Sequence, residues 1–125
     1  MHIPTDRSYT KDHEWALSGE TFVEIGITDY AQDALGDVVY VQLPQVGTKV
    51  ARGATIAEVD STKSVSDIFS PVSGVVVEVN SNLASNPELL NTSPYDNGWI
   101  VRIEPAMPLD LEVISHQDYS LLIAV

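Results

Sequence analysis

A four-residue pattern, Pro-x-x-Gly, occurs twice in the chain and restricts the folds that it can adopt. The first copy spans 44–47 and the second spans 71–74, and each leads into valine-bearing sequence. Because proline and glycine favour turns and valine favours strands, each copy predicts a turn followed by a strand. The two copies together indicate a weak internal repeat, with two similar β units folded around a two-fold axis. The alternative is two unrelated β-turns.

Lys63 lies between the two copies, in a short connection rich in serine and threonine. Apolar stretches that alternate imperfectly flank it at 54–59 and 65–69, as half-buried strands do. This arrangement predicts a β-hairpin with Lys63 at its tip. A lysine in that position holds its amine in water, where it is free for covalent modification. The alternative is an ordinary exposed lysine that only keeps the turn soluble.

Turn and capping signals predict the remaining elements. A hairpin is expected at 15–27. A helix should follow, with Asp29 as N-cap in a capping box and Gly36 as the left-handed residue after the last turn. A shorter helix is expected at 86–91, with Asn86 as its N-cap, and strands are expected at 38–43 and 99–104. Ser115 should cap a C-terminal helix of about 115–122. These elements predict one mainly β domain over 1–125, with short peripheral helices.

Composition and charge narrow the possible functions. The 125 residues carry a formal net charge of −12, so nucleic acid and anionic membranes are poor partners, whereas proteins with basic patches are better ones. The chain has no cysteine, and its three histidines have no metal-ligand spacing, so no metal site is predicted. No phosphate loop or catalytic constellation is found. The sequence therefore predicts a non-catalytic carrier, whose attached group is acted on by other enzymes.

The expected location also rests on features that the sequence lacks. The N-terminus has no apolar segment typical of a secretory signal, and no run reaches the length of a membrane span. The expected location is the cytoplasm of a bacterium, with an organelle form as the alternative.

Seven stretches of the chain form motifs in a fixed order: 9–15, 26–37, 41–47, 64–67, 71–80, 86–91 and 94–99. In that order they resemble one known family, the H proteins of the glycine cleavage system. The resemblance runs from about residue 9 to residue 105, and the tail after Met107 matches only loosely. Near the central lysine the family usually reads Glu-Ser-Val-Lys, whereas this chain reads Asp-Ser-Thr-Lys at 60–63.

The resemblance implies a barrel-sandwich hybrid, the fold of lipoyl and biotinyl domains, which agrees with the internal repeat. It implies lipoic acid in amide linkage on Lys63, added by a lipoate-attaching enzyme as a post-translational modification. The domain core would span about 9–105. Glu14 and Asp67 match acidic positions that the family uses near the lipoyl arm. The alternative for each of these two residues is a solvated strand-end carboxylate.

The implied function is a relay in glycine catabolism and one-carbon metabolism. The lipoyl arm accepts the aminomethyl group of glycine at a pyridoxal-phosphate-dependent decarboxylase, the P protein. It presents this group to an aminomethyltransferase, the T protein, which uses tetrahydrofolate. A dihydrolipoyl dehydrogenase, the L protein, then re-oxidises the arm.

Other interpretations remain open at this point. A biotin carrier has the same fold, but it typically has methionines where Thr62 and Ser64 stand. A lipoyl domain of a 2-oxo acid dehydrogenase usually has aspartate before the lysine and belongs to a larger chain. An H-like protein could also pass its lipoyl group to other enzymes. The remaining alternative is an interaction module that is never modified.

Overall fold

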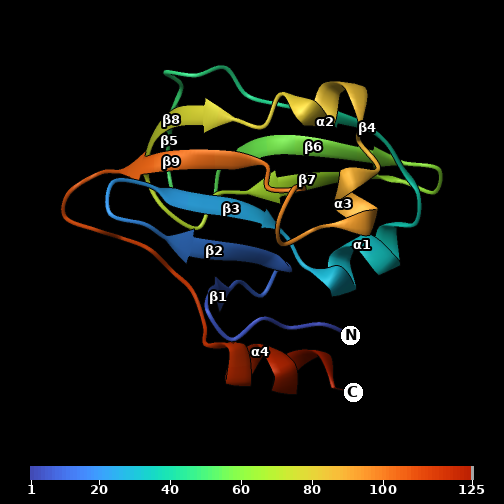
Figure 1. Ribbon diagram of the computed structural model, residues 1–125. Helices are drawn as coiled ribbons and strands as arrows, with labels where there is room; N and C mark the ends of the chain where they lie inside the picture. Colours follow the sequence, from blue (N-terminus) through green and yellow to red (C-terminus); the bar gives the residue numbers. More distant parts are fainter. Residues whose placement is uncertain (125) are drawn as a thin grey trace.

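The computed structural model describes residues 1–124 and arranges the strands in two sheets (Figure 1). The larger sheet has the order β1-β2-β3-β9-β8-β5, and the smaller sheet has the order β4-β6-β7. This mainly β architecture with short helices confirms the predicted fold class. The strands are β1 (Ser8–Tyr9), β2 (Glu14–Ser18), β3 (Val23–Ile27), β4 (Val38–Gln42), β5 (Lys49–Val50), β6 (Thr55–Ser61), β7 (Val65–Phe69), β8 (Gly74–Val79) and β9 (Val101–Pro105). The helices are α1 (Asp29–Leu35), α2 (Asn82–Ser85), α3 (Leu89–Thr92) and α4 (His116–Ile123).

The main core lies between the two sheets. Buried aliphatic side chains from both sheets belong to one cluster, so the sheets pack against each other as a sandwich. The larger sheet contributes Ile25, Val76 and Ile103, and the smaller sheet contributes Val41, Val59 and Ile68. No helix within residues 1–124 is long and apolar enough to cross a membrane.

The two Pro-x-x-Gly segments lie side by side. The strands that follow them, β5 and β8, pair antiparallel, with Val50 opposite Gly74. The backbone N–H of Gly47 donates to the carbonyl of Val76 at 2.7 Å, and the Val76 N–H donates to Thr48 at 2.9 Å. The equivalent parts of the repeat therefore contact each other, as expected for two units related by a two-fold axis.

Strands β2 and β3 form the predicted hairpin, with Trp15 directly opposite Gly26. A Cβ atom on Gly26 would lie 2.6 Å from the indole ring of Trp15, which is fully buried. The lack of a side chain at Gly26 therefore leaves room for the Trp15 ring to lie against the backbone of this residue. The indole N–H donates to the carbonyl of Pro94 at 2.9 Å and fixes its orientation.

The predicted N-cap of α1 was wrong by one residue. Thr28 is the N-cap, and its hydroxyl accepts from the N–H of Ala31 at 3.2 Å. The carboxylate of Asp29 instead accepts from the side chain of Gln32 at 2.7 Å and from the N–H of His2 at 3.0 Å. The helix ends before Gly36 as predicted, and Gly36 has a positive φ of 79°, but its ψ of −159° lies outside the left-handed helical region that was expected.

The prediction between 80 and 92 also needs correction. Two four-residue helices, α2 and α3, replace the single helix that was expected at 86–91. Asn86 is the C-cap of α2, and its N–H donates to the carbonyl of Asn82 at 2.8 Å. Each short helix buries one leucine, Leu83 in α2 and Leu90 in α3. Burial of these two side chains outweighs the local signal of Asn86 followed by proline.

The C-terminal helix α4 begins as predicted, with the Ser115 hydroxyl accepting from the N–H of Asp118 at 3.1 Å. Tyr119 anchors the helix. Its ring is fully buried and stacks on Tyr9, with ring centroids 4.7 Å apart. Its hydroxyl lies 2.8 Å from the Thr28 hydroxyl and 2.8 Å from Nδ1 of His13. Burial raises the pKa of Tyr119 to about 12, so the hydroxyl keeps its proton at neutral pH.

Tyr119→Phe should lower the free energy of unfolding by about 1–2 kcal/mol, because two hydrogen bonds of a buried hydroxyl are lost while the ring stays packed. Urea denaturation followed by circular dichroism measures this change. Tyr40→Phe is the matched control, since the Tyr40 side chain is 52% exposed and should change stability little. Equal midpoints for the two variants would show that the hydroxyl of Tyr119 does not hold α4.

Candidate functional site

Lys63 lies at the tip of the β6–β7 hairpin, which confirms the predicted hairpin. The strands pair antiparallel up to Asp60 opposite Val65. The hydroxyl of Ser61 accepts from the N–H groups of Lys63 and Ser64, both at 3.1 Å. The N–H of Ser61 donates to the carbonyl of Ser64 at 2.8 Å. These bonds within the turn fix the backbone that carries the lysine.

A second set of contacts holds the tip from outside the hairpin. The N–H of Thr62 donates to the carbonyl of Asp37 at 3.0 Å, and Ser61 is paired with Val38 of β4. The Lys63 side chain is exposed and forms no ion pair with any residue between 1 and 124. A primary amine on a fixed turn, free of a carboxylate partner, can react with an activated acyl group.

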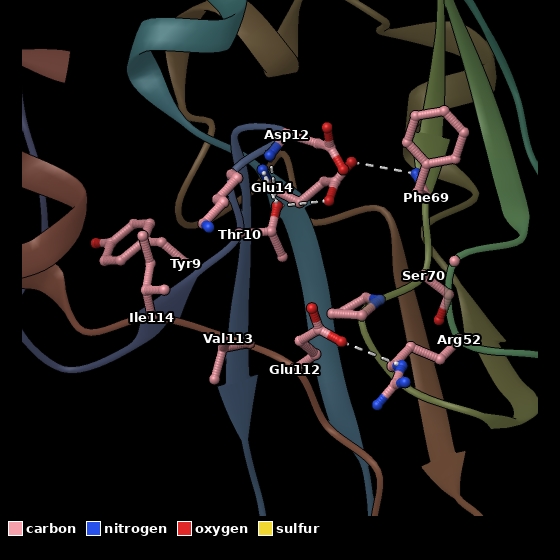
Figure 2. A pocket seen from close by; sticks show the side chains of 13 residues that line it. Tyr9, Thr10, Asp12, Glu14, Arg52, Phe69, Ser70, Glu112, Val113 and Ile114 are labelled. Carbon is pink, nitrogen blue, oxygen red and sulfur yellow. Dashed lines mark hydrogen bonds and ion pairs between the residues drawn. The ribbon is translucent and has the colours of Figure 1, made fainter. Parts of the chain in front are cut away.

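Glu14 lines a surface pocket with a volume of about 420 Å³. Figure 2 shows its carboxylate between Thr10 and the backbone of Phe69. One oxygen accepts from the Thr10 hydroxyl at 2.6 Å, and the other accepts from the Phe69 N–H at 3.1 Å. Glu14 is only 2% exposed, so the alternative of a solvated strand-end carboxylate is wrong for this residue.

Burial gives Glu14 unusual acid–base properties. Desolvation raises the pKa of its carboxyl from an ordinary 4.5 to about 7, and the charge of Asp12 adds to this shift. The hydrogen bonds from Thr10 and Phe69 favour the ionised form and limit the shift. Near neutral pH the pocket therefore holds a carboxyl group that a nearby cation could ionise fully.

The far end of the same pocket carries opposite charges. Arg52 and Glu112 form an ion pair of 3.4 Å there, away from Glu14 (Figure 2). Both side chains are largely exposed, so the pair contributes little to stability. The pocket thus has a buried carboxyl at one end and a solvated ion pair at the other.

Asp67 lies elsewhere, on the outer face of the smaller sheet, and lines a second pocket of about 230 Å³. It is exposed and directly opposite Glu58, whose neighbour on the same face is Asp60. Asp60 raises the pKa of Glu58, with a smaller effect from Asp67. The structure therefore does not bring Asp67 and Glu14 into one pocket. Both approach β7, because Asp67 belongs to it and Glu14 binds its last residue, Phe69.

Several residues of this region were not found from the sequence. Asp60 and Glu58 could have been recognised by their alternation along β6. Asn91 gave no signal, because its role depends on side-chain hydrogen bonds to segments more than 50 residues away in the chain. Thr10 bonds Glu14 only four residues away, but a threonine at that spacing in a strand region is not a recognised motif. Among the described residues no group of three His, Cys, Asp or Glu side chains is arranged to hold a metal ion.

Comparison with known proteins identifies the family. The sequence model for "Glycine cleavage H-protein" matches residues 7–123. The glycine cleavage system H protein of Thermus thermophilus is 57% identical over 112 residues, which are 90% of this chain and 88% of that protein. The corresponding protein of Anaeromyxobacter sp. is 51% identical over 114 residues, 91% of this chain and 89% of that protein.

A solved structure agrees with these sequence matches. The glycine cleavage system H protein of Mycobacterium marinum superimposes with a TM-score of 0.91 at 42% identity, covering 98% of this chain and all of that one. The sequence matches, the shared fold and the hairpin lysine all lead to one assignment. The chain belongs to the glycine cleavage H-protein family, and so to a family of lipoyl carriers.

Proposed function

We propose that this protein carries a lipoyl group on Lys63 and serves as the shuttle of glycine cleavage. The observation that carries the proposal is the exposed amine of Lys63 on a hairpin tip whose backbone N–H groups donate hydrogen bonds to Ser61 and Asp37. Membership of the H-protein family supports lipoate rather than biotin as the attached group. The bacterial sources of the similar proteins favour a bacterial cytoplasm as the place of action.

The division of labour follows from membership of a family of carriers. The attached lipoyl group supplies a ring disulfide that takes up the aminomethyl group of glycine and later releases it. The chain supplies an anchoring point and a sheltered pocket, while the glycine decarboxylase, the aminomethyltransferase and the dihydrolipoyl dehydrogenase perform the reactions. The net charge of −12 suits partners with basic docking surfaces.

We also assign a role to the two acidic residues. The group taken from glycine is an amine and therefore carries a positive charge at neutral pH. The Glu14 side chain is only 2% exposed, so an ionised carboxylate there attracts such a cation more strongly than one in bulk solvent. Asp67 is exposed, and its attraction is screened by water and salt.

Glu14→Gln should speed the hydrolytic loss of ammonia and formaldehyde from the charged carrier by about tenfold, and Asp67→Asn by less, because solvent already screens Asp67. Neither substitution should change attachment at Lys63. Colorimetric assay of both products, with the aminomethyltransferase omitted, measures the loss. If neither variant loses its cargo faster than the parent, the shelter must come from apolar contacts instead.

The function itself is tested by reconstitution. The protein is first incubated with a lipoate-attaching enzyme, lipoate and ATP, and its intact mass is measured. It is then combined with the three partner enzymes, glycine, tetrahydrofolate and NAD, and NADH formation is followed. The proposal expects a gain of one lipoyl group and glycine-dependent NADH. A chain that stays unmodified would instead be an interaction module, and a lipoylated chain without glycine turnover would favour a lipoate relay.

A further inference from the structure

The side chain of Lys63 lies on the bare backbone of Gly36, at the end of α1. A Cβ atom built on Gly36 would lie 3.2 Å from Cε of Lys63, 3.5 Å from Cδ and 3.7 Å from Cγ. The outer aliphatic part of the lysine, from Cγ to Cε, therefore runs over a residue that has no side chain. A side chain at position 36 would bring its Cβ closer to Cε than ordinary van der Waals contact, so Cε would have to shift by a few tenths of an ångström.

Asn91 of α3 holds this glycine and its neighbours in place. Its carbonyl oxygen accepts from the N–H of Val38 at 2.9 Å. Its amide nitrogen donates to the carbonyl of Gly36 at 2.9 Å and to the side-chain oxygen of Gln32 at 3.1 Å. The donors and the acceptor of one half-buried side chain thus fix the segment on both sides of Asp37.

The same segment is bonded to the hairpin tip. The carbonyl of Asp37 accepts from the N–H of Thr62 at 3.0 Å, and Val38 pairs with Ser61. Asn91 therefore influences Lys63 by two routes. One runs through Asp37 to the backbone of Thr62, and the other runs through Gly36, on which the Lys63 side chain lies.

We propose that the Gly36–Asp37 segment, held by Asn91, is a platform that positions the Lys63 side chain for acylation. The proposal rests on the proposed function, because it concerns the step that loads the carrier. In that step Nζ of Lys63 attacks the carbonyl carbon of a lipoyl adenylate formed from lipoate and ATP. The new C–N bond replaces the bond to the phosphate oxygen, AMP leaves with the electron pair, and the amine loses a proton to water. Asn91 and Gly36 are positioning residues, since neither takes part in these bonds.

A simpler explanation of Gly36 has to be separated from this one. Its dihedral angles, φ 79° and ψ −159°, are those of a region that is almost exclusive to glycine. Glycine could therefore stand here for backbone reasons alone. Asn91 provides the cleaner test, because its substitution leaves both Gly36 and Lys63 unchanged.

The experiment compares two platform variants with two controls. Asn91→Asp replaces the amide nitrogen, which donates to the Gly36 carbonyl and to the Gln32 side-chain oxygen, by an oxygen that can only accept. Gly36→Ala places a methyl group under the Lys63 side chain. Asn97→Asp makes the same chemical change at an exposed side chain, and Gly47→Ala introduces strain at φ 94° with no atom within 4 Å. All four are assayed at a temperature at which circular dichroism shows them folded.

Three readouts are taken on each protein. The first is the nuclear Overhauser effect between the Lys63 Cε protons and the Gly36 Cα protons. The second is kcat and KM for attachment by the ligase, with intact mass as the signal. The third is acetylation of Lys63 by a small reagent relative to Lys11 and Lys49, which reports exposure of the amine without the enzyme.

Both platform variants should lose the nuclear Overhauser effect and show a fall in kcat of about fivefold to tenfold, because a long side chain must then be ordered during the reaction. KM and small-reagent acetylation should stay near the parent values, and both controls should behave as the parent. An absent nuclear Overhauser effect in the parent protein would overturn the proposal. A normal kcat in Asn91→Asp after loss of the effect would also overturn it, as would an equal fall in the controls. Failure of the parent to be lipoylated at Lys63 would instead refute the proposed function.

Discussion

Lys63→Arg is expected to abolish lipoyl attachment completely while the protein stays folded. Arginine keeps the positive charge of the turn, but its guanidinium remains protonated and does not form an amide as a lysine amine does. The Lys63 side chain is exposed, without an ion pair among residues 1–124, so the free energy of unfolding should change by less than about 0.5 kcal/mol. Intact mass after incubation with the ligase, and a urea denaturation curve, test both parts.

Lys11→Arg and Lys49→Arg are the matched controls, because they replace the two other lysines of the chain. Both should accept one lipoyl group at the parent rate and should support glycine turnover in the reconstituted system. Lipoyl mass retained on the Lys63→Arg protein would show that the modified residue had been assigned wrongly.

A second large effect is expected from the buried carboxyl of Glu14. Its pKa is raised to about 7 in the folded protein, from the ordinary 4.5 of an exposed chain. Between these two values the folded state binds a proton that the unfolded state has lost, so stability is fully present at low pH and falls as the pH rises toward 7. The expected loss is up to about 3 kcal/mol between pH 4.5 and pH 8, since each unit of pKa shift is worth about 1.4 kcal/mol.

Glu14→Gln should remove this part of the pH dependence. The glutamine oxygen can accept from the Phe69 N–H, and its amide can donate to the Thr10 hydroxyl, so the neutral side chain remains satisfied. Denaturation midpoints measured from pH 4.5 to pH 8 should therefore converge with those of the parent at low pH and exceed them at high pH. Glu20→Gln, at an exposed turn, serves as the control. Parallel curves for parent and Glu14→Gln would show that Glu14 titrates in its ordinary range.

Local sequence signals predicted the parts of the site that depend on neighbouring residues. The Lys63 hairpin follows from two apolar stretches and a short polar connection. The ends of α1 and α4 follow from Gly36 and Ser115, whose conformations or hydrogen bonds are set within one turn. These features need no knowledge of the rest of the fold.

The features that could not be predicted from the sequence depend on contacts between distant segments of the chain. Asp29 has the residue type of an N-cap, but Thr28 takes that role while Asp29 binds the N-terminal segment through His2. Only the family resemblance points to Glu14. Its burial depends on the packing of β2 against the end of β7, which its neighbours in the sequence do not reveal. The H-protein resemblance pointed to Glu14 and Asp67 together, whereas the fold places them in different pockets.

The hydroxyl of Thr28 connects helix α1 with helix α4. It caps the first turn of α1 and also bonds the hydroxyl of Tyr119 in α4, so one atom belongs to two helices that are far apart in the sequence. Release of α4 from the surface leaves that cap with one partner fewer and uncovers the ring of Tyr9. We therefore expect the amide protons of α4 and of the first turn of α1 to gain or lose protection from solvent exchange together.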